Sequence, residues 1–300
     1  MPTNKPTNKP TKTPTRTPTN KPTSAQGKFK HARPAASRTT RNTTDWNGVA
    51  DWYDQVVGPA GSEYHQHVVF PRSLKLLDVK TDHRVLDVAC GQGAFSRILA
   101  QKAAKVAGID ASTDLIKIAK QYNTPDLPRP INYFCGDARE ISSILRGHKF
   151  DSAVCLLALQ NIQPIAPIFA GLSALLEPDG KLVMVMTHPC FRGAKESHWG
   201  WDEEAQTQYR RVDRYLLPRK HPITAHPGKA ASGGDSEYTW TFHRPLESYV
   251  RDLSRAGFMI DAMEEWTSHK LSQPGARAAA ENRSREEIPM FLAIRAVLVR

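Results

Sequence analysis

The sequence predicts a doubly wound α/β domain, in which helices cover both faces of a mostly parallel sheet. Two observations predict it. Short segments that are apolar throughout, as strands buried on both faces are, alternate along the chain with stretches of helical periodicity. Acidic residues stand near the ends of the first three apolar segments. The expected strands are residues 84–89, 105–110, 131–137, 150–159, 181–188, 257–266 and 289–299.

Helices are expected before the first strand and between the later ones. Trp46, Val49 and Trp52 recur at helical spacing, which predicts a helix soon after residue 45. A second helix over 63–77 is expected to break at Pro71, because an interior proline lacks the N–H and clashes with the preceding turn. Later helices are expected over 94–104, after Ser112 as N-cap, and from about residue 244.

Residues 1–44 differ from the rest of the chain in composition. Residues 2–23 repeat a Pro-Thr unit with a period of four, which excludes a helix and offers no apolar side chains to bury. The segment holds ten of the 41 Lys and Arg residues and no Asp or Glu, so 31 basic and 30 acidic residues remain in 45–300. We therefore expect a disordered basic tail, followed by a nearly neutral domain over 45–300.

The composition limits the partners and the compartment. A nucleic-acid-binding domain usually carries a basic face, so nucleic acid is expected as a partner only through the tail. No apolar run approaches the roughly 18 residues of a membrane-spanning helix, and the N-terminus lacks the apolar segment of a secretory signal. The four cysteines have no CxxC spacing, as expected of reduced thiols in a cytoplasmic protein. The oligomeric state is left open.

The turn after the first expected strand is the main candidate for a ligand site. It reads Asp87-Val-Ala-Cys-Gly91-Gln-Gly93-Ala-Phe-Ser96, and open parallel sheets bind ligands at the carboxyl ends of their strands. Its two glycines permit a tight bend and close approach of the backbone to a ligand. A dinucleotide site is the alternative. Against it, Ser96 replaces the third glycine, and Asp87 would repel a pyrophosphate while favouring a cationic ligand.

These blocks resemble the class I S-adenosylmethionine-dependent methyltransferases. The D-x-x-C-G-x-G turn, Asp110 at the end of the second strand, GDA at 136–138 and LEPDGKLVM at 176–184 carry the resemblance. It implies a seven-stranded Rossmann-like sheet of order 3-2-1-4-5-7-6.

The resemblance also implies an organisation around that sheet. Residues 45–80 would form a helical N-terminal cover. The 55 residues of 189–243 would form an insertion that covers the substrate. This insertion is rich in aromatic residues, and a loop of such length inside a domain is usually functional.

The resemblance assigns roles to individual residues. Asp87 would lie beside the positively charged methionyl end of S-adenosylmethionine. Asp110 would accept hydrogen bonds from the ribose hydroxyls, and Asp137 from the adenine amino group. The full set of cofactor-binding residues is Asp87, Gly91, Gly93, Asp110, Asp137, Ala138 and Leu157.

The methyl acceptor is expected to be a small or lipid-like molecule. The fourth strand is not followed by an (N/D)-P-P-(Y/F) turn, the signature of exocyclic-amine methylation, and Leu157 to Asn161 is closer to small-molecule and quinone-type methyltransferases. His188, after the fifth strand, is the candidate general base, although a histidine bonded within its own turn is equally compatible. Candidate substrate residues are Tyr64, His65, Gln160 and Asn161.

Two other functions remain open. A tRNA or rRNA methyltransferase would use the basic tail for nonspecific attraction, and a non-catalytic module would only bind S-adenosylmethionine. No metal is expected, because His65 and His67 have no further ligands at suitable spacing.

Overall fold

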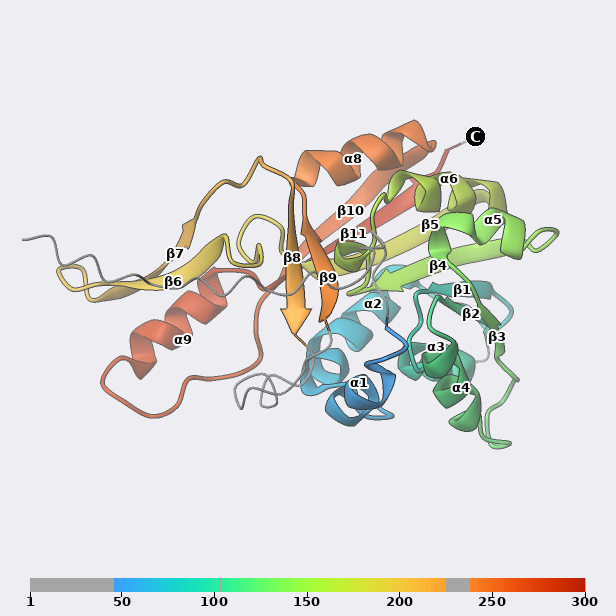
Figure 1. The fold of residues 1–300 in the computed structure, drawn as a ribbon, viewed down its shortest axis with the longest axis horizontal. Coiled ribbons are helices and arrows are strands. Elements are labelled where there is room, and N and C mark those ends of the chain that lie inside the picture. The colour runs from blue at the N-terminus through green and yellow to red at the C-terminus, as the bar shows by residue number, and fades with distance from the viewer. Residues whose placement is uncertain (1–45, 103, 225–237, 300) are drawn as a thin grey trace, which may run out of the picture. The chain divides into compact units, whose positions relative to one another are not determined.

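A seven-stranded sheet of order β3-β2-β1-β4-β5-β11-β10 forms the centre of the structure (Figure 1). The structure is a computed structural model that describes residues 46–102, 104–224 and 238–299. The expected tail, residues 1–44, lies outside the described residues. The strands of the sheet are β1 Arg84–Val88, β2 Lys105–Asp110, β3 Asn132–Cys135, β4 Phe150–Leu156, β5 Leu176–Thr187, β10 Phe258–Trp266 and β11 Phe291–Leu298.

The topology confirms the predicted fold class and strand order. β3, β2, β1, β4 and β5 are parallel neighbours, and β11 runs antiparallel to both β5 and β10. Counted along the chain within this sheet, the seventh strand (β11) therefore lies between the fifth (β5) and the sixth (β10), as in the expected order 3-2-1-4-5-7-6.

Two apolar cores lie on the two faces of the sheet. In β1, Leu86 and Val88 belong to one core and Val85 to the other, which is the alternation of a strand buried on both sides. One core packs against α5 (Ile141–Ile144), α6 (Ala166–Leu175) and α8 (Leu246–Arg255). The other packs against α2 (Phe70–Leu77), α3 (Ala94–Gln101) and α4 (Thr113–Gln121), and Figure 1 shows these helix groups on opposite sides of the sheet.

The expected break at Pro71 is wrong. The chain is helical through this region, with a π-helical turn, His65–Val69, leading directly into α2. The N–H of Phe70 bonds to the carbonyl of His65 five residues back, and Pro71 lies in the first turn of α2. A proline is tolerated there because the first N–H groups of an α-helix have no partner within it.

The N-terminal region forms a shorter helix than expected. α1 begins at Ala50 and ends at Val57, so Trp46 precedes the helix. The ring of Trp46 still contacts that of Tyr53, with centroids 5.5 Å apart in an edge-to-face arrangement. Trp46 is therefore packed against the helix that it does not join.

The segment 189–243 contains two antiparallel strand pairs. β6 (Ser197–Asp202) pairs with β7 (Thr207–Val212), and β8 (Arg219–Thr224) pairs with β9 (Tyr238–His243). A helix that the sequence analysis missed, α9 (Ala278–Glu287), packs against β7, and the Ser284 hydroxyl donates to the carbonyl of Gln208 at 2.8 Å. Among the described residues, no helix is both long and apolar enough to cross a bilayer.

The buried position of Leu86 in β1 gives a test of the fold. Its side chain is 0% exposed at the centre of β1, so Leu86→Ala should lower the free energy of unfolding by about 2–5 kcal/mol, the range for cavity formation in a core. Met259→Ala, at a position that is 58% exposed, should change it by less than about 1 kcal/mol. Urea denaturation measures both, and equal losses would contradict the placement of Leu86 in the core.

Candidate functional site

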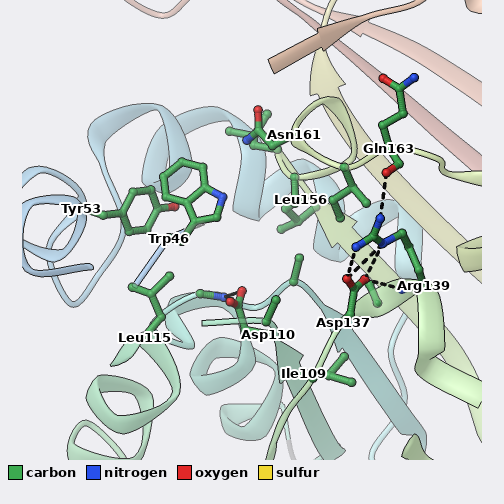
Figure 2. Close-up of a pocket in the computed structure, with 18 of the residues that line it drawn as sticks. Trp46, Tyr53, Ile109, Asp110, Leu115, Asp137, Arg139, Leu156, Asn161 and Gln163 are labelled. Atoms are coloured by element: carbon green, nitrogen blue, oxygen red, sulfur yellow. Dashed lines mark hydrogen bonds and ion pairs between the residues drawn. The ribbon is translucent and has the colours of Figure 1, made fainter. Parts of the chain in front are cut away.

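A cleft opens at the carboxyl ends of β1 to β4. It encloses about 900 Å³, part of it open to solvent. Figure 2 shows Trp46 and Tyr53 on one side of it, Asp137 and Arg139 on the other, and Asp110 between them. This is the position at which open parallel sheets bind ligands.

Asp110 joins the two loops that form the floor of the cleft. Its carboxylate accepts the Gly91 N–H at Oδ2 (2.9 Å) and the Ser112 N–H at Oδ1 (2.8 Å). The side chain is buried, and this burial raises its pKa. Each carboxylate oxygen has two lone pairs, so both can accept a further bond from a ligand in the cleft.

The two glycines of the turn meet different steric demands. Gly91 and Gly93 both have positive φ, 56° and 76°, a conformation that favours glycine. A Cβ at Gly93 would lie 2.2 Å from the Tyr133 hydroxyl, whereas one at Gly91 would be 3.7 Å from Tyr53 Cε1. Gly91 lines the cleft and Gly93 does not, so Gly93 is required for packing beneath the turn.

Asp87 lies behind the turn and does not line the cleft. It is 2% exposed, and the Ser96 hydroxyl donates to its Oδ2 at 2.6 Å. Burial raises the pKa of Asp87 to about 7, while the bond from Ser96 opposes this shift. Ser96, which stands where a dinucleotide motif has its third glycine, is therefore the hydrogen-bond partner of Asp87.

Asp137 is the N-cap of the short 3₁₀ turn Ala138–Glu140. Its carboxylate accepts a hydrogen bond from the Arg139 N–H at 2.9 Å and forms an ion pair with the guanidinium of the same residue. These contacts with Arg139 lower the pKa of Asp137. Arg139 also donates to the carbonyl of Gln163 at 3.0 Å. The expected adenine contact thus already binds an arginine, and both residues line the cleft (Figure 2).

The wall formed by Trp46 and Tyr53 is fastened to α4. Asn47 accepts hydrogen bonds from the hydroxyls of Ser112 (3.0 Å) and Thr113 (3.1 Å), and Tyr122 donates to Asp54 at 2.8 Å. Burial and the negative charge of Asp110 raise the pKa of Tyr53 to about 12, so its phenol keeps its proton. A cover was predicted here from the sequence, but neither ring was predicted to be part of the cleft.

Comparison with known proteins agrees with this geometry. The family model "Methyltransferase domain" matches residues 86–184, which run from β1 to β5 and include the residues of the cleft floor. The S-adenosylmethionine-dependent methyltransferase from Mesorhizobium loti is 26% identical in sequence; the superposition covers 76% of this chain and 96% of that one, with a TM-score of 0.57. The chain belongs to the class I S-adenosylmethionine-dependent methyltransferase superfamily.

Two further relatives extend the comparison. A ubiquinone biosynthesis O-methyltransferase from Coxiella burnetii is 33% identical over 136 residues, which are 44% of this chain and 55% of that protein. This chain therefore spans little more than half the length of the curated relatives it matches. The glycopeptide N-methyltransferase MtfA, solved with S-adenosylmethionine, shares the fold, with 16% identity, a TM-score of 0.51 and coverage of 76% of this chain and 92% of that one.

S-adenosylmethionine is the cofactor of this superfamily, and the cleft suits it. The cleft combines a buried carboxylate that retains free lone pairs with aromatic rings and the backbone of a glycine that lines it. Such a set can bind hydroxyl groups, a flat heterocycle and an alkyl chain together. The role of each residue toward the cofactor belongs to the proposal below.

The segment after β4 provides three predicted residues in different positions. Leu157, with φ of 54°, and Asn161 line the cleft, as does Ala138 from the adjoining turn. Gln160 is not part of the lining, and its amide donates to the carbonyl of Leu157 at 2.7 Å. Gln160 therefore fixes the backbone of the cleft wall.

His188 lies at the end of β5, outside the cleft lining. Its Nδ1 accepts the Cys190 N–H at 3.2 Å, and its Nε2 is 2.8 Å from Glu265 Oε1. The side chain is buried, which lowers its pKa. Both ring nitrogens are bonded within the protein, and the general-base role stays a prediction.

Tyr64 and His65 also lie away from the cleft lining. The Tyr64 hydroxyl is 3.2 Å from Ser268 Oγ, and His65 Nδ1 bonds to Ser62. Burial lowers the pKa of His65 to about 4, so the ring is neutral and packs beside Phe70. The described residues contain no cluster of three or more His, Cys, Asp or Glu side chains that could hold a metal ion.

A pair of alanine substitutions separates the clash that a side chain at Gly93 would make with Tyr133 from the backbone strain of positive φ. Gly93→Ala and Gly147→Ala both place alanine at positive φ, but a Cβ at Gly147 meets nothing within 4 Å. Both should destabilise the fold by about 1 kcal/mol through strain. Gly93→Ala should in addition weaken S-adenosylhomocysteine binding in calorimetry by at least about tenfold, as the turn shifts. Equal affinity in the two variants would show that the turn tolerates a side chain there.

The buried carboxyl of Asp87 predicts a pH dependence of stability. Its pKa rises from 3.8 in the unfolded chain to about 7 in the folded one, so the folded state retains a proton that the unfolded state releases. The contribution of Asp87 to stability should therefore fall as pH rises from about 4 to 7. In urea denaturation, Asp87→Asn should flatten this slope.

Asp137 provides the control of opposite sign. Its pKa is lowered by Arg139, so Asp137→Asn should cost stability at neutral pH and have less effect in acid. An unchanged slope in Asp87→Asn would contradict the environment assigned to Asp87.

Proposed function

We propose that the chain transfers a methyl group from S-adenosylmethionine to an O or N atom of a small or lipid-like acceptor. The observation that carries the proposal is the buried Asp110 carboxylate on the floor of the cleft, with free lone pairs facing the space between Trp46 and Arg139. A carboxylate in this position suits a ligand with vicinal hydroxyl groups, because it can accept from both at once.

The remaining cofactor roles follow from the position of each group. The Gly91 backbone and Leu157 flank the methionyl part. Asp137 and Ala138 flank the adenine, with Asp137 shared between the base and Arg139. Trp46 and Tyr53 close the cleft from the N-terminal side and exclude water. Asp87 acts from behind the turn, through its position and charge, without lining the cleft.

The bound cofactor supplies an electrophilic methyl group: a lone pair of the acceptor bonds to this carbon while the carbon–sulfur bond breaks and leaves its electrons on sulfur. The protein's part is alignment and desolvation. The acceptor's proton leaves to water or to a base. His188 remains the candidate base and would act through water or after a rearrangement, because it does not line the cleft.

Two observations support a small acceptor. At and directly after the end of β4, the cleft wall is apolar at Leu156, Leu157 and Ala158, and the polar residues Asn161 and Gln163 follow further along the chain. The match to a ubiquinone biosynthesis O-methyltransferase covers 136 residues, which is in keeping with oxygen as the accepting atom. The described part of the chain provides no observation that favours RNA.

The ribose assignment is tested by a pair of substitutions. Asp110→Ala should weaken S-adenosylhomocysteine binding by at least about 100-fold, since it removes charge-assisted hydrogen bonds. Asp110→Asn, which keeps one acceptor oxygen and so one of the two bonds from the backbone N–H groups, should weaken it less. Asp261→Ala, on the far strand β10, removes an ion pair with Arg295 and should leave it unchanged. Calorimetry measures all three, and equal effects at residues 110 and 261 would refute the assignment.

The acceptor class is tested by label transfer. The full chain is incubated with methyl-labelled S-adenosylmethionine and cell extract, and the products are separated into small molecules, lipids, RNA and protein. Label should appear in the small-molecule or lipid fraction. Label in RNA would favour the tRNA or rRNA alternative, and S-adenosylmethionine binding without any label transfer would identify a non-catalytic module.

A further inference from the structure

A second cavity adjoins the cofactor cleft. It encloses about 910 Å³, part of it open to solvent, and it shares Arg139, Gln163 and Phe242 with the cleft. Its other walls are Pro164, Pro218, Arg219 and Lys220. A molecule in this cavity can therefore extend past Phe242 toward the place where the methyl group is expected.

The described residues of this cavity carry charges of one sign. They include Arg139, Arg219 and Lys220 and no carboxylate. Arg139 is already paired with Asp137. Among the described residues, the ion-pair contact of Arg219 is a long one, 3.9 Å from its Nε to Glu196 Oε1, and that Nε has no hydrogen-bond partner there.

Glu196 alone cannot neutralise the positive charges of Arg219 and Lys220. It is buried, and the same Oε1 lies 3.7 Å from His221 Nε2. Lys220 makes no ion pair with any described residue. Its Nζ lies 3.8 Å from the centre of the Trp240 ring and 5.9 Å from that of Phe242. An ammonium over an aromatic face is held in place by the ring, so this charge is positioned at the cavity, and no carboxylate in the described part of the chain balances it.

The β8–β9 strand pair holds these groups beside the cleft wall. The Thr241 hydroxyl donates to the carbonyl of Gln160 at 3.3 Å, and Arg244 donates to the carbonyls of Leu159 (2.9 Å) and Ile162 (2.6 Å). Lys220 is the register partner of Phe242. The anchoring that places Phe242 in the cleft therefore also fixes Lys220 in the second cavity.

We propose that the methyl acceptor is an organic anion whose carboxylate or phosphate binds Lys220 and Arg219 in the second cavity. Its apolar body lies along Phe242 and the two prolines, and its O or N nucleophile enters the cofactor cleft. The anionic group is distinct from the methylated atom, so the product keeps its negative charge. This inference rests on the proposed function, because it specifies the acceptor of the same methyl transfer.

Anion exchange of the labelled products tests the substrate class. The full chain is incubated with methyl-labelled S-adenosylmethionine and the small-molecule fraction of cell extract, and the products are applied to an anion exchanger at pH 7. The labelled product should be retained. A labelled product that flows through with the unreacted cofactor, or one that forms only when RNA is supplied, would overturn the proposal.

Substitutions then test the residues, with the purified acceptor as probe. Lys220→Met and Arg219→Met should each raise its KM by about 10- to 100-fold, the effect of losing a hydrogen bond to a charged group, with a smaller change in kcat. The control is Lys149→Met, at an exposed lysine before β4, at the opposite end of the sheet, and it should leave KM unchanged. An unchanged KM in Lys220→Met would overturn the proposal.

Calorimetry with S-adenosylhomocysteine separates this inference from the proposed function. All three variants should bind it as the unsubstituted chain does, because none of these side chains takes part in the cofactor cleft floor. Normal binding and transfer to a neutral product would reject the anionic acceptor alone. Failure of the unsubstituted chain to bind would reject both proposals.

Discussion

The bond between the Gly91 N–H and the Asp110 carboxylate is the contact on which the site depends. It ties the turn after β1 to the end of β2, and the second oxygen of the same carboxylate accepts the N–H of Ser112, the N-cap of α4. Ser112 in turn donates to Asn47, ahead of α1. One buried acidic residue thus fixes the floor of the cleft and, through α4, the position of the N-terminal wall.

The fold was predictable where the apolar pattern carries the information. β2 has the predicted bounds, and Ser112 caps α4 as expected, because both depend on local sequence. The continuous helix across Pro71 was not predicted. A π-helical turn precedes the proline, so Pro71 lies in the first turn of α2, where its missing N–H is tolerated. α9 was missed because its sequence, AAAENRSREE, has no apolar stripe and it is held by β7.

The site was predictable at the strand ends and less so elsewhere. Spacing and resemblance pointed to Asp110 and Asp137, and both line the cleft. The ion pair of Asp137 with Arg139 is a local contact that the motif did not indicate, and the part of Tyr53 in the cleft wall depends on tertiary packing that no motif encodes. His188, chosen for its place after the fifth strand, is turned toward Glu265, an interaction across strands that the sequence does not reveal.

A crystal structure of the chain with S-adenosylhomocysteine tests the central claim most directly. Both ribose hydroxyls should lie within hydrogen-bonding distance of the Asp110 carboxylate, with Trp46 and Tyr53 on one side of the ligand and Asp137 on the other. A ligand bound outside the cleft, or a ribose held by a different carboxylate, would contradict the account.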